Sequence, residues 1–406
     1  MKHVVVKHDS GGSCPLWIPV GSVLLKPDFL TMIHKMLPMN IFAGSLPWAR
    51  SLCVLGAFLS GVAAIHAADG PDRVQVIHAP GASNVMKAER GADGAIHLFF
   101  DADGGPHYVK STDDGATFSA PLSVVDDAAR KPGLEYTTWD MAVGQDGRVH
   151  VVMGTNAWKL KLPQEQWGLQ YATLAPGAKT FSPIRNLNHK PSEGYSLAAS
   201  GSGAVTASFL SGKVYTMTSR DGGQSFSPYA EVNPLIDPCK CCTTSTTYGP
   251  DGRLALIYRE ETNNERDIYL VLADRNGRQK RTRISTTSWQ LQACPMTYFT
   301  IRGTPAGYVT AWPTKGQIYF ARLDKDGAVL PPGEIPTPGR NGMRTGVVAL
   351  SAPDGVSLVA WKNQDVLGWQ LYDVAGSPLG KPGSVPSRGS GAAAVVLGDG
   401  RFAVFP

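Results

Sequence analysis

The sequence predicts an all-β protein made of repeated units, and three observations support this class. Turn-forming residues are abundant, with 45 Gly and 30 Pro in a chain of 406 residues, as in proteins with many short strands. No convincing amphipathic helix occurs beyond the N-terminal region. A hairpin of two β-type runs around a Gly-containing turn recurs about every fifty residues, which is the period expected of the blades of a β-propeller. The turns of these hairpins fall near Asp93, Asp146, Gly201, Asp251, Pro305, Asp354 and Asp399.

The hairpins predict a propeller of six or seven four-stranded blades, and their number favours seven. We expect this domain to occupy residues 71–406. The last unit, residues 392–405, contains only two β-type runs. The run from Val74 to Ile77 precedes the first unit and could supply a further strand to the last one. We therefore expect the N-terminal strand to close the ring.

Residues 39–68 have the features of a secretory signal peptide. Arg50 precedes an apolar run, residues 52–64, and small residues follow at Ala67 and Ala68. The apolar run is too short to span a membrane comfortably. Residues 1–38 show no pattern that fits the fold, and we interpret them as a misassigned upstream extension. The sequence thus predicts a periplasmic or secreted bacterial protein that is free of the membrane after signal cleavage.

The charge of the chain gives no indication of a nucleic-acid partner. The formal net charge is +5, and the N-terminal region contributes several of the lysines. The basic run at residues 278–283 fits a solvated turn. We expect a monomer that binds no nucleic acid.

A short pattern, Ser-x-Asp-x-Gly-x-x-Phe, occurs twice, each time between two β-type runs. The Asp carboxylate can accept backbone N–H bonds inside a tight turn, and Gly can adopt a conformation closed to other residues. The Phe ring would pack beneath the turn. We expect both copies to be structural turns between the third and fourth strands of a blade. Their residues are Ser111, Asp113, Gly115 and Phe118, and Ser219, Asp221, Gly223 and Phe226.

This pattern resembles the Asp-box, or BNR repeat, of the sialidase superfamily of β-propellers. The resemblance implies that ligands bind on the face opposite to these turns, where the connections between blades open. Sialidases also need three arginines around the substrate carboxylate, a Tyr–Glu nucleophile pair and an Asp that acts as the acid/base. The Arg-Ile-Pro motif that contains the first of these arginines in the family is missing before Ser111. The resemblance therefore implies an architecture and not a chemistry, and the catalytic residues stay unknown.

Four cysteines remain after signal cleavage, and the repeat should bring them together at one end of the channel. They lie near the starts of two neighbouring inner strands, at Cys239, Cys241, Cys242 and Cys294, with Met296 close by. Three interpretations stay open. The cysteines could form two disulfides, with Cys294 paired to Cys241 or Cys242; they could hold copper(I) together with the Met296 thioether; or they could include a redox-active dithiol.

A charged cluster and several tryptophans should share the face of the cysteines. The arginines of the cluster could bind a carboxylate or sulfate through paired hydrogen bonds, or an Arg–Asp pair could brace the loop. Trp158 and Trp167 belong to a long loop on the same face. The ligand-binding candidates are Arg259, Glu260, Arg266, Asp267, Trp139, Asp140 and Arg344.

Residues 237–315 also resemble a subfamily of secreted bacterial propellers labelled sialidase-like. The shared features are Cys-x-Cys-Cys from Cys239, Tyr-Arg at Arg259 followed by Arg-Asp-Ile at Arg266, and Trp289 ahead of Cys294-Pro. This resemblance implies no particular activity. We therefore predict an exported propeller that binds a glycan or another anionic or polar molecule on the cysteine-bearing face. Two alternatives stay open, a glycoside hydrolase of the exo-α-sialidase type and a periplasmic copper-binding protein.

Overall fold

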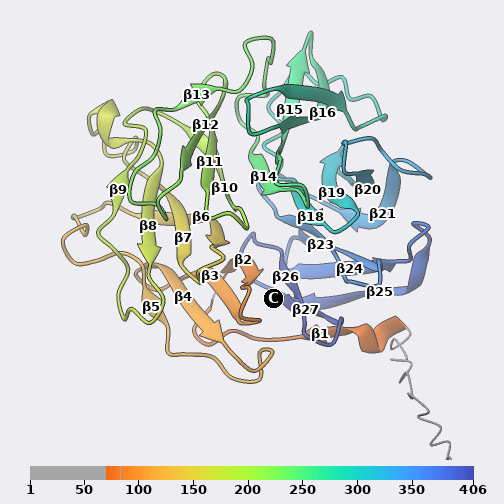
Figure 1. The fold of residues 1–406 in the computed structure, drawn as a ribbon, viewed down its shortest axis with the longest axis horizontal. Coiled ribbons are helices and arrows are strands. Elements are labelled where there is room, and N and C mark those ends of the chain that lie inside the picture. The colour runs from red at the N-terminus through yellow and green to blue at the C-terminus, as the bar shows by residue number, and fades with distance from the viewer. Residues whose placement is uncertain (1–69, 83) are drawn as a thin grey trace, which may run out of the picture. The chain divides into compact units, whose positions relative to one another are not determined.

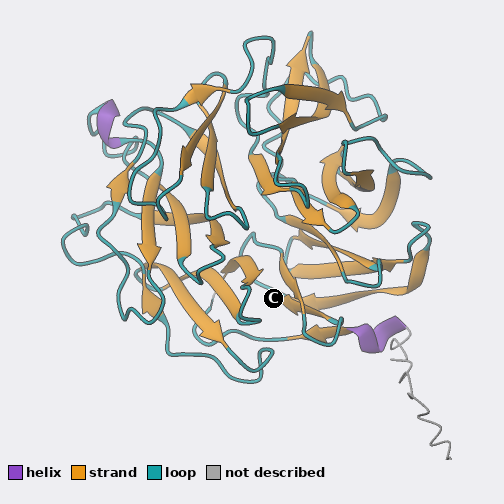
Figure 2. Cartoon of the chain, viewed as in Figure 1, coloured by secondary structure: helices purple, strands orange, loops and turns teal. Residues whose placement is uncertain are grey.

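The structure is a computed structural model that describes residues 70–82 and 84–406. These residues form seven β-sheets arranged in a ring, which is a seven-bladed propeller (Figure 1). In this part of the chain, the helices are two short 3-10 turns, η1 (Gly70–Arg73) and η2 (Gln164–Gln166) (Figure 2). The all-β class and the preferred number of blades are confirmed. The predictions for residues 1–38 and 39–68 lie outside the described residues.

Six of the blades are four-stranded antiparallel sheets in which the strands follow chain order from the channel outward. Blades 1 to 3 contain β2 (Asn84–Arg90), β3 (Ile96–Ala102), β4 (Gly105–Ser111) and β5 (Leu122–Ser123); β6 (Tyr136–Val143), β7 (Val149–Thr155), β8 (Gln170–Leu174) and β9 (Arg185–Asn186); and β10 (Glu193–Ala199), β11 (Val205–Leu210), β12 (Val214–Ser219) and β13 (Ala230–Glu231). Blades 4 to 6 contain β14 (Thr244–Tyr248), β15 (Leu254–Thr262), β16 (Glu265–Ala273) and β17 (Gln279–Arg283); β18 (Thr300–Thr304), β19 (Gly307–Thr314), β20 (Gln317–Asp324) and β21 (Ile335–Arg340); and β22 (Val347–Ser351), β23 (Ser357–Asn363), β24 (Val366–Tyr372) and β25 (Pro378–Pro386).

The seventh blade closes the ring with three strands, β26 (Ala393–Val396), β27 (Phe402–Phe405) and β1 (Val74–Val76). Strand β1 pairs in parallel with β27, and the N–H of Ile77 donates to the carbonyl of Val404 at 3.0 Å. Arg73, just before β1, forms an ion pair with Asp354 of the loop between β22 and β23. The predicted closure by the N-terminal strand is therefore confirmed, in a blade of three strands instead of four.

The core lies between blades, because each sheet packs against a neighbour on both of its faces. Every residue of β11 is buried, so this strand reads as a continuous run without the alternation of a half-exposed strand. One apolar cluster combines Phe99 of blade 1 with Met141 of blade 2, and another combines Ile257 of blade 4 with Trp312 of blade 5. Among the described residues, no helix has the length and apolar character needed to cross a membrane.

The two Ser-x-Asp-x-Gly-x-x-Phe segments form turns between the third and fourth strands of blades 1 and 3. The hydroxyl of Ser111 donates to Asp113 at 2.7 Å and accepts the N–H of Gly115 at 2.9 Å. The second turn repeats these bonds at Ser219, where the distances are 2.7 and 2.8 Å. Its Phe226 packs edge-on against Tyr171 of blade 2, so this turn also joins neighbouring blades.

Candidate functional site

Loops at one end of blades 2 to 6 surround a cavity of about 710 Å³. These loops either connect one blade to the next or join the second and third strands of a blade. The two Ser-x-Asp-x-Gly turns join third to fourth strands and therefore lie at the other end of the strands. The cavity wall combines aromatic and charged side chains. It includes Trp139, Trp158, Trp167, Tyr195 and Tyr298, together with Glu135, Lys159, Glu193, Lys240 and Arg344.

Most aromatic side chains of the cavity wall are packed against other groups, and one of them is accessible to a ligand. Trp139 stacks edge-on against Tyr195, with 5.1 Å between ring centroids, and lies 6.0 Å from the ring of Tyr298. The indole N–H of Trp167 donates to the carbonyl of Leu162 at 2.8 Å, which fixes this ring within its loop. Trp158, in contrast, is 58% exposed. An exposed indole in a concave site offers a flat apolar surface to a ligand.

Two residues of opposite charge, Glu193 and Arg344, lie in the cavity wall. Arg344 lies in the loop before β22, and its backbone N–H donates to the carbonyl of Met296 at 2.8 Å. Glu193 begins β10 and is exposed, and partial burial of its carboxyl group in the cavity raises its pKa; the positive charge of Arg344 opposes this rise, and the nearby Cys242 adds to it. A carboxyl group with a raised pKa therefore shares the cavity with a guanidinium.

The charged cluster of blade 4 lies behind the cavity wall and not in it. Arg259 is 1% exposed and donates to the carbonyls of Pro313 and Arg266 and to the hydroxyl of Thr297, at 2.5, 3.3 and 3.3 Å. Pro313 belongs to β19 of blade 5, so Arg259 braces two blades. Its guanidinium also lies 4.9 Å from the ring centroid of Trp289.

The other polar candidates are also engaged within the protein. Glu260 pairs with Arg281 at 2.8 Å, Asp267 pairs with Arg283 at 2.7 Å, and Arg266 donates to the carbonyl of Leu291 at 3.2 Å. All three are buried. Asp140 forms an ion pair with Lys87 in the central channel and accepts the N–H of Leu197 at 2.9 Å. Of the seven ligand candidates, Trp139 and Arg344 line the 710 Å³ cavity.

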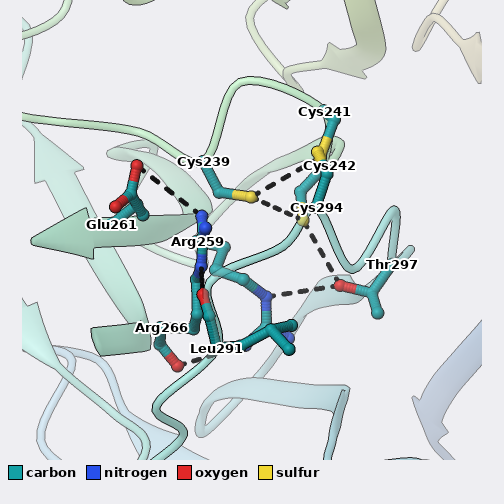
Figure 3. The surroundings of a disulfide bond; sticks show 9 residues. All are labelled: Cys239, Cys241, Cys242, Arg259, Glu261, Arg266, Leu291, Cys294 and Thr297. Carbon is teal, nitrogen blue, oxygen red and sulfur yellow. Dashed lines mark hydrogen bonds and ion pairs between the residues drawn. A yellow bond between two sulfur atoms is a disulfide. The ribbon is translucent and has the colours of Figure 1, made fainter. Parts of the chain in front are cut away.

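The cysteines lie in the loops that precede β14 and β18, just ahead of the inner strands and not at their first residues. The N–H of Cys239 donates to the carbonyl of Arg259 at 2.8 Å, which fixes the loop to the end of β15. The N–H of Cys242 then donates to the carbonyl of Cys239 at 3.3 Å and closes a tight turn. This turn gathers three sulfur atoms on one side of the loop (Figure 3).

A disulfide joins Cys241 to Cys294, with 6.2 Å between their Cα atoms, and so ties blade 4 to blade 5. Cys294 is therefore paired with Cys241, which is one of the two partners that the sequence allowed. The bridge spans 53 residues, for which the chain-entropy model gives about 4 kcal/mol of stabilisation. Cys239 and Cys242 are buried free thiols. Their sulfur atoms are 3.3 Å apart, and that of Cys242 lies 3.4 Å from the hydroxyl of Thr297.

The two free thiols form a hydrogen-bonded pair beside the guanidinium of Arg259. Burial opposes charge on Cys242, but a hydrogen bond with Cys239 and the Arg259 guanidinium outweigh it and lower the Cys242 pKa to about 6. The pKa of Cys239 is raised, first by its hydrogen bond with Cys242 and then by burial. The Cys242 sulfur donates to that of Cys239, so a thiolate formed by this pair is shared between the two sulfur atoms.

The predicted copper site has three of its sulfur donors close together. The sulfur atoms of Cys239, Cys241 and Cys242 lie within 4.8 Å of one another, but that of Cys241 is bonded to Cys294. A soft metal ion would gain this third thiolate after reduction of the disulfide. Met296, another predicted copper ligand, uses its backbone carbonyl to accept the N–H of Arg344.

Several residues of the cavity wall were not predicted from the sequence, namely Glu135, Glu193, Tyr195, Lys240 and Tyr298. Tyr195 and Glu193 begin an inner strand, and Tyr298 directly precedes one. A systematic survey of the residues at the start of every inner strand would have selected them, because these starts surround the channel mouth.

No family model and no curated protein matches the chain. Solved structures that resemble it include the K499G mutant of NanB sialidase from Streptococcus pneumoniae, with a TM-score of 0.46, 9% identity, and coverage of 71% of this chain and 67% of that chain. A family PL25 ulvan lyase has a TM-score of 0.48 and 12% identity, over 78% of this chain and 87% of the lyase. A prolyl endopeptidase has a TM-score of 0.44 and 11% identity, over 78% of this chain and 44% of the endopeptidase. These likenesses concern the fold alone, and the propeller assignment rests on the blade topology.

Proposed function

We propose that this chain is an exported, sialidase-like propeller that binds an acidic glycan in the cavity on its cysteine-bearing face. The observation that carries the proposal is the 710 Å³ cavity, which combines the exposed ring of Trp158 with the positive charge of Arg344. Its volume falls within the range of about 300–1,000 Å³ that is usual for ligand sites.

The lining of the cavity supports this ligand class. The C–H face of a sugar ring packs on an indole, whose own surface is apolar and flat. A carboxylate or sulfate on the sugar would pair with Arg344, since a guanidinium matches the geometry of such groups through two parallel hydrogen bonds. Lys159 and Lys240 add positive charge to the wall, and Glu135 and Glu193 offset part of it.

The test is a titration of tryptophan fluorescence with three acidic oligosaccharides, one sialylated, one sulfated and one rich in uronic acid, with lactose as the neutral control. We expect at least one acidic probe to bind more tightly than lactose. Arg344→Gln should weaken that binding by about tenfold or more, as loss of a charge-assisted hydrogen bond predicts. Arg340→Gln is the matched control, because Arg340 is exposed and lies outside the cavity wall.

Failure of all three probes, or equal binding by the Arg344 variant and the wild type, would contradict the proposal. Glycoside hydrolysis of the exo-α-sialidase type is the second candidate, since Glu193 presents a carboxyl group of raised pKa to the same cavity and could donate a proton. A fluorogenic sialoside distinguishes the two functions. We expect no turnover, and turnover that is lost in Glu193→Gln would favour the hydrolase.

A further inference from the structure

The four cysteines of the propeller form two sulfur pairs that differ in accessibility. Cys294 is exposed, and its disulfide partner Cys241 lies in the cavity wall. The free thiols of Cys239 and Cys242 belong to residues only 1% and 2% exposed. The sulfur of Cys239 lies 3.3 Å from that of its partner thiol, Cys242, and 3.8 Å from the disulfide sulfur of Cys241 (Figure 3). A buried dithiol therefore contacts an accessible disulfide.

We propose that these residues form a thiol–disulfide exchange site, in which the buried dithiol of Cys239 and Cys242 reduces the accessible disulfide of Cys241 and Cys294. The proposal is independent of the glycan ligand. The CxxC spacing of Cys239 and Cys242 suits a disulfide between them, because their sulfur atoms are already in contact.

The exchange takes two steps. The Cys242 sulfur keeps the shared proton and donates to Cys239, and the thiolate of Cys239 attacks the sulfur of Cys241, 3.8 Å away; the Cys239–Cys241 bond forms, the Cys241–Cys294 bond breaks, and the electron pair leaves on Cys294. Cys242 then loses the proton to Cys294 and attacks Cys239, so that the Cys239–Cys242 bond forms and the electron pair leaves on Cys241. The buried pair is oxidised by two electrons and the accessible pair is reduced by two. One proton moves from the first pair to the second, and no external oxidant or reductant is needed.

The electrostatics of the site favour this chemistry over binding of a metal cation such as copper(I). The buried guanidinium of Arg259 stabilises a negative charge shared by Cys239 and Cys242. Its hydrogen bonds to Pro313, Arg266 and Thr297 fix it beside the sulfur atoms. A fixed positive charge stabilises the thiolate, whereas it would repel a metal cation at the same place.

The exchange would also change the wall of the cavity. The Cys241–Cys294 bond links the loop before β14 to the loop before β18, and the Cys239–Cys242 bond would remain within one loop. Two residues after Cys294, the carbonyl of Met296 accepts the N–H of Arg344, so the freed loop contacts a cavity residue directly. The reduced Cys241 and Cys294 would lie where a small disulfide can reach them.

Tryptic peptides allow both disulfides to be read separately, because Lys240 separates Cys239 from Cys241. The full chain is equilibrated in a series of glutathione buffers that differ in redox potential, and it is then quenched in acid, alkylated and digested. The original bond joins peptides 241–253 and 284–302, whereas the exchanged bond joins peptides 221–240 and 241–253. Fragmentation of the linked peptides between Cys241 and Cys242 distinguishes the exchanged bond from the Cys239–Cys241 intermediate. We expect both linkages in the wild type at the poise where about one disulfide is present per propeller. Cys294 should then be alkylated in the same fraction of chains that carry the exchanged bond.

Two variants assign the steps. Cys239→Ser should lower alkylation of Cys294 at that poise by about tenfold, because the attacking sulfur is gone. Cys242→Ser should stop the reaction after the first step, with the 221–240 and 241–253 peptides linked and Cys294 free. The proposal is overturned if the wild type shows no exchanged linkage at any poise, or if Cys239→Ser leaves Cys294 alkylation unchanged. Purification of the wild type with one copper ion per chain and both buried thiols reduced would also overturn it.

Discussion

Two histidine–tyrosine pairs occupy equivalent positions in the first two blades. Nδ1 of His97 lies 2.7 Å from the hydroxyl of Tyr108, and His150 makes the same contact with Tyr171 at 2.7 Å. Both histidines are buried, and burial lowers the pKa of each imidazole to about 4, because the charged form would lose its hydration. The folded protein therefore holds both rings neutral.

These pairs predict an acid-sensitive fold. Between pH 6.5 and about 4, the unfolded chain takes up a proton at His150 that the folded chain does not, so the free energy of unfolding falls as the pH falls. The full effect is about 3 kcal/mol per histidine. Urea unfolding across this pH range should show a smaller loss for His150→Gln than for the wild type. His78→Gln is the control, since His78 is exposed; equal slopes for all three proteins would contradict the prediction.

Residue type could be read from the sequence, but burial could not. Arg259 and Arg266 have the chemistry of anion-binding residues, yet both bond to backbone carbonyls: Arg259 joins blade 4 to blade 5, and Arg266 holds the loop between these blades. Their partners Pro313 and Leu291 are 54 and 25 residues away along the chain. No local pattern specifies such partners, because they depend on how one blade packs against the next.

At the scale of elements, the Ser-x-Asp-x-Gly-x-x-Phe turns were predictable because their hydrogen bonds are local. Ser219 bonds to Asp221 and to Gly223, all within one turn. The turn also packs on the preceding blade, where Gly223 approaches the Tyr171 hydroxyl and the His150 ring. The glycine is thus required both by its backbone conformation and by its neighbours.

Comparison of Gly223→Ala with Gly203→Ala separates the cost of the backbone conformation from the cost of the neighbouring side chains. Gly223 and Gly203 both have a φ of +84°, but a Cβ at Gly223 would clash with Tyr171, whereas a Cβ at Gly203 would meet nothing within 4 Å. We expect Gly203→Ala to cost about 1 kcal/mol through backbone strain, and Gly223→Ala about 3 kcal/mol because overpacking adds to it. Chemical unfolding of both variants measures the difference. Equal losses would show that the contact with Tyr171 is unimportant.

The cavity could be predicted only in part from the elements. Trp139, Trp158, Trp167 and Arg344 were assigned to the correct face by the order of strands in a blade. Glu193 and Tyr298 were not, because each lies in an ordinary β-type context, and the cavity appears only when loops of five blades meet. The convergence of the four cysteines was predictable, since it follows from the repeat length.

At the scale of the molecule, the ring depends on a contact between the two ends of the propeller. Strand β1 covers the edge of β27, and Val74 and Val76 pack against the core shared by blades 6 and 7. Arg73 extends this closure to blade 6 through Asp354 and lies over the ring of Phe402, 5.9 Å from its centroid. The closure was readable from the sequence, because the last unit lacked strands and a β-type run was left over at the start.

Removal of β1 should therefore destabilise the whole ring and not only its last blade. A chain that begins at His78 loses the strand and the N–H bond from Ile77 to Val404, which leaves the edge of β27 unpaired. An unpaired edge strand invites pairing between chains, so we expect a lower melting temperature together with oligomers on size-exclusion chromatography. A chain that begins at Gly70 is the matched control, since it keeps η1 and β1 and differs only by these eight residues, 70–77. Because every blade packs on its two neighbours, the loss should appear as one cooperative transition at lower temperature. Equal melting temperatures for the two chains would show that the ring is held closed without its N-terminal strand.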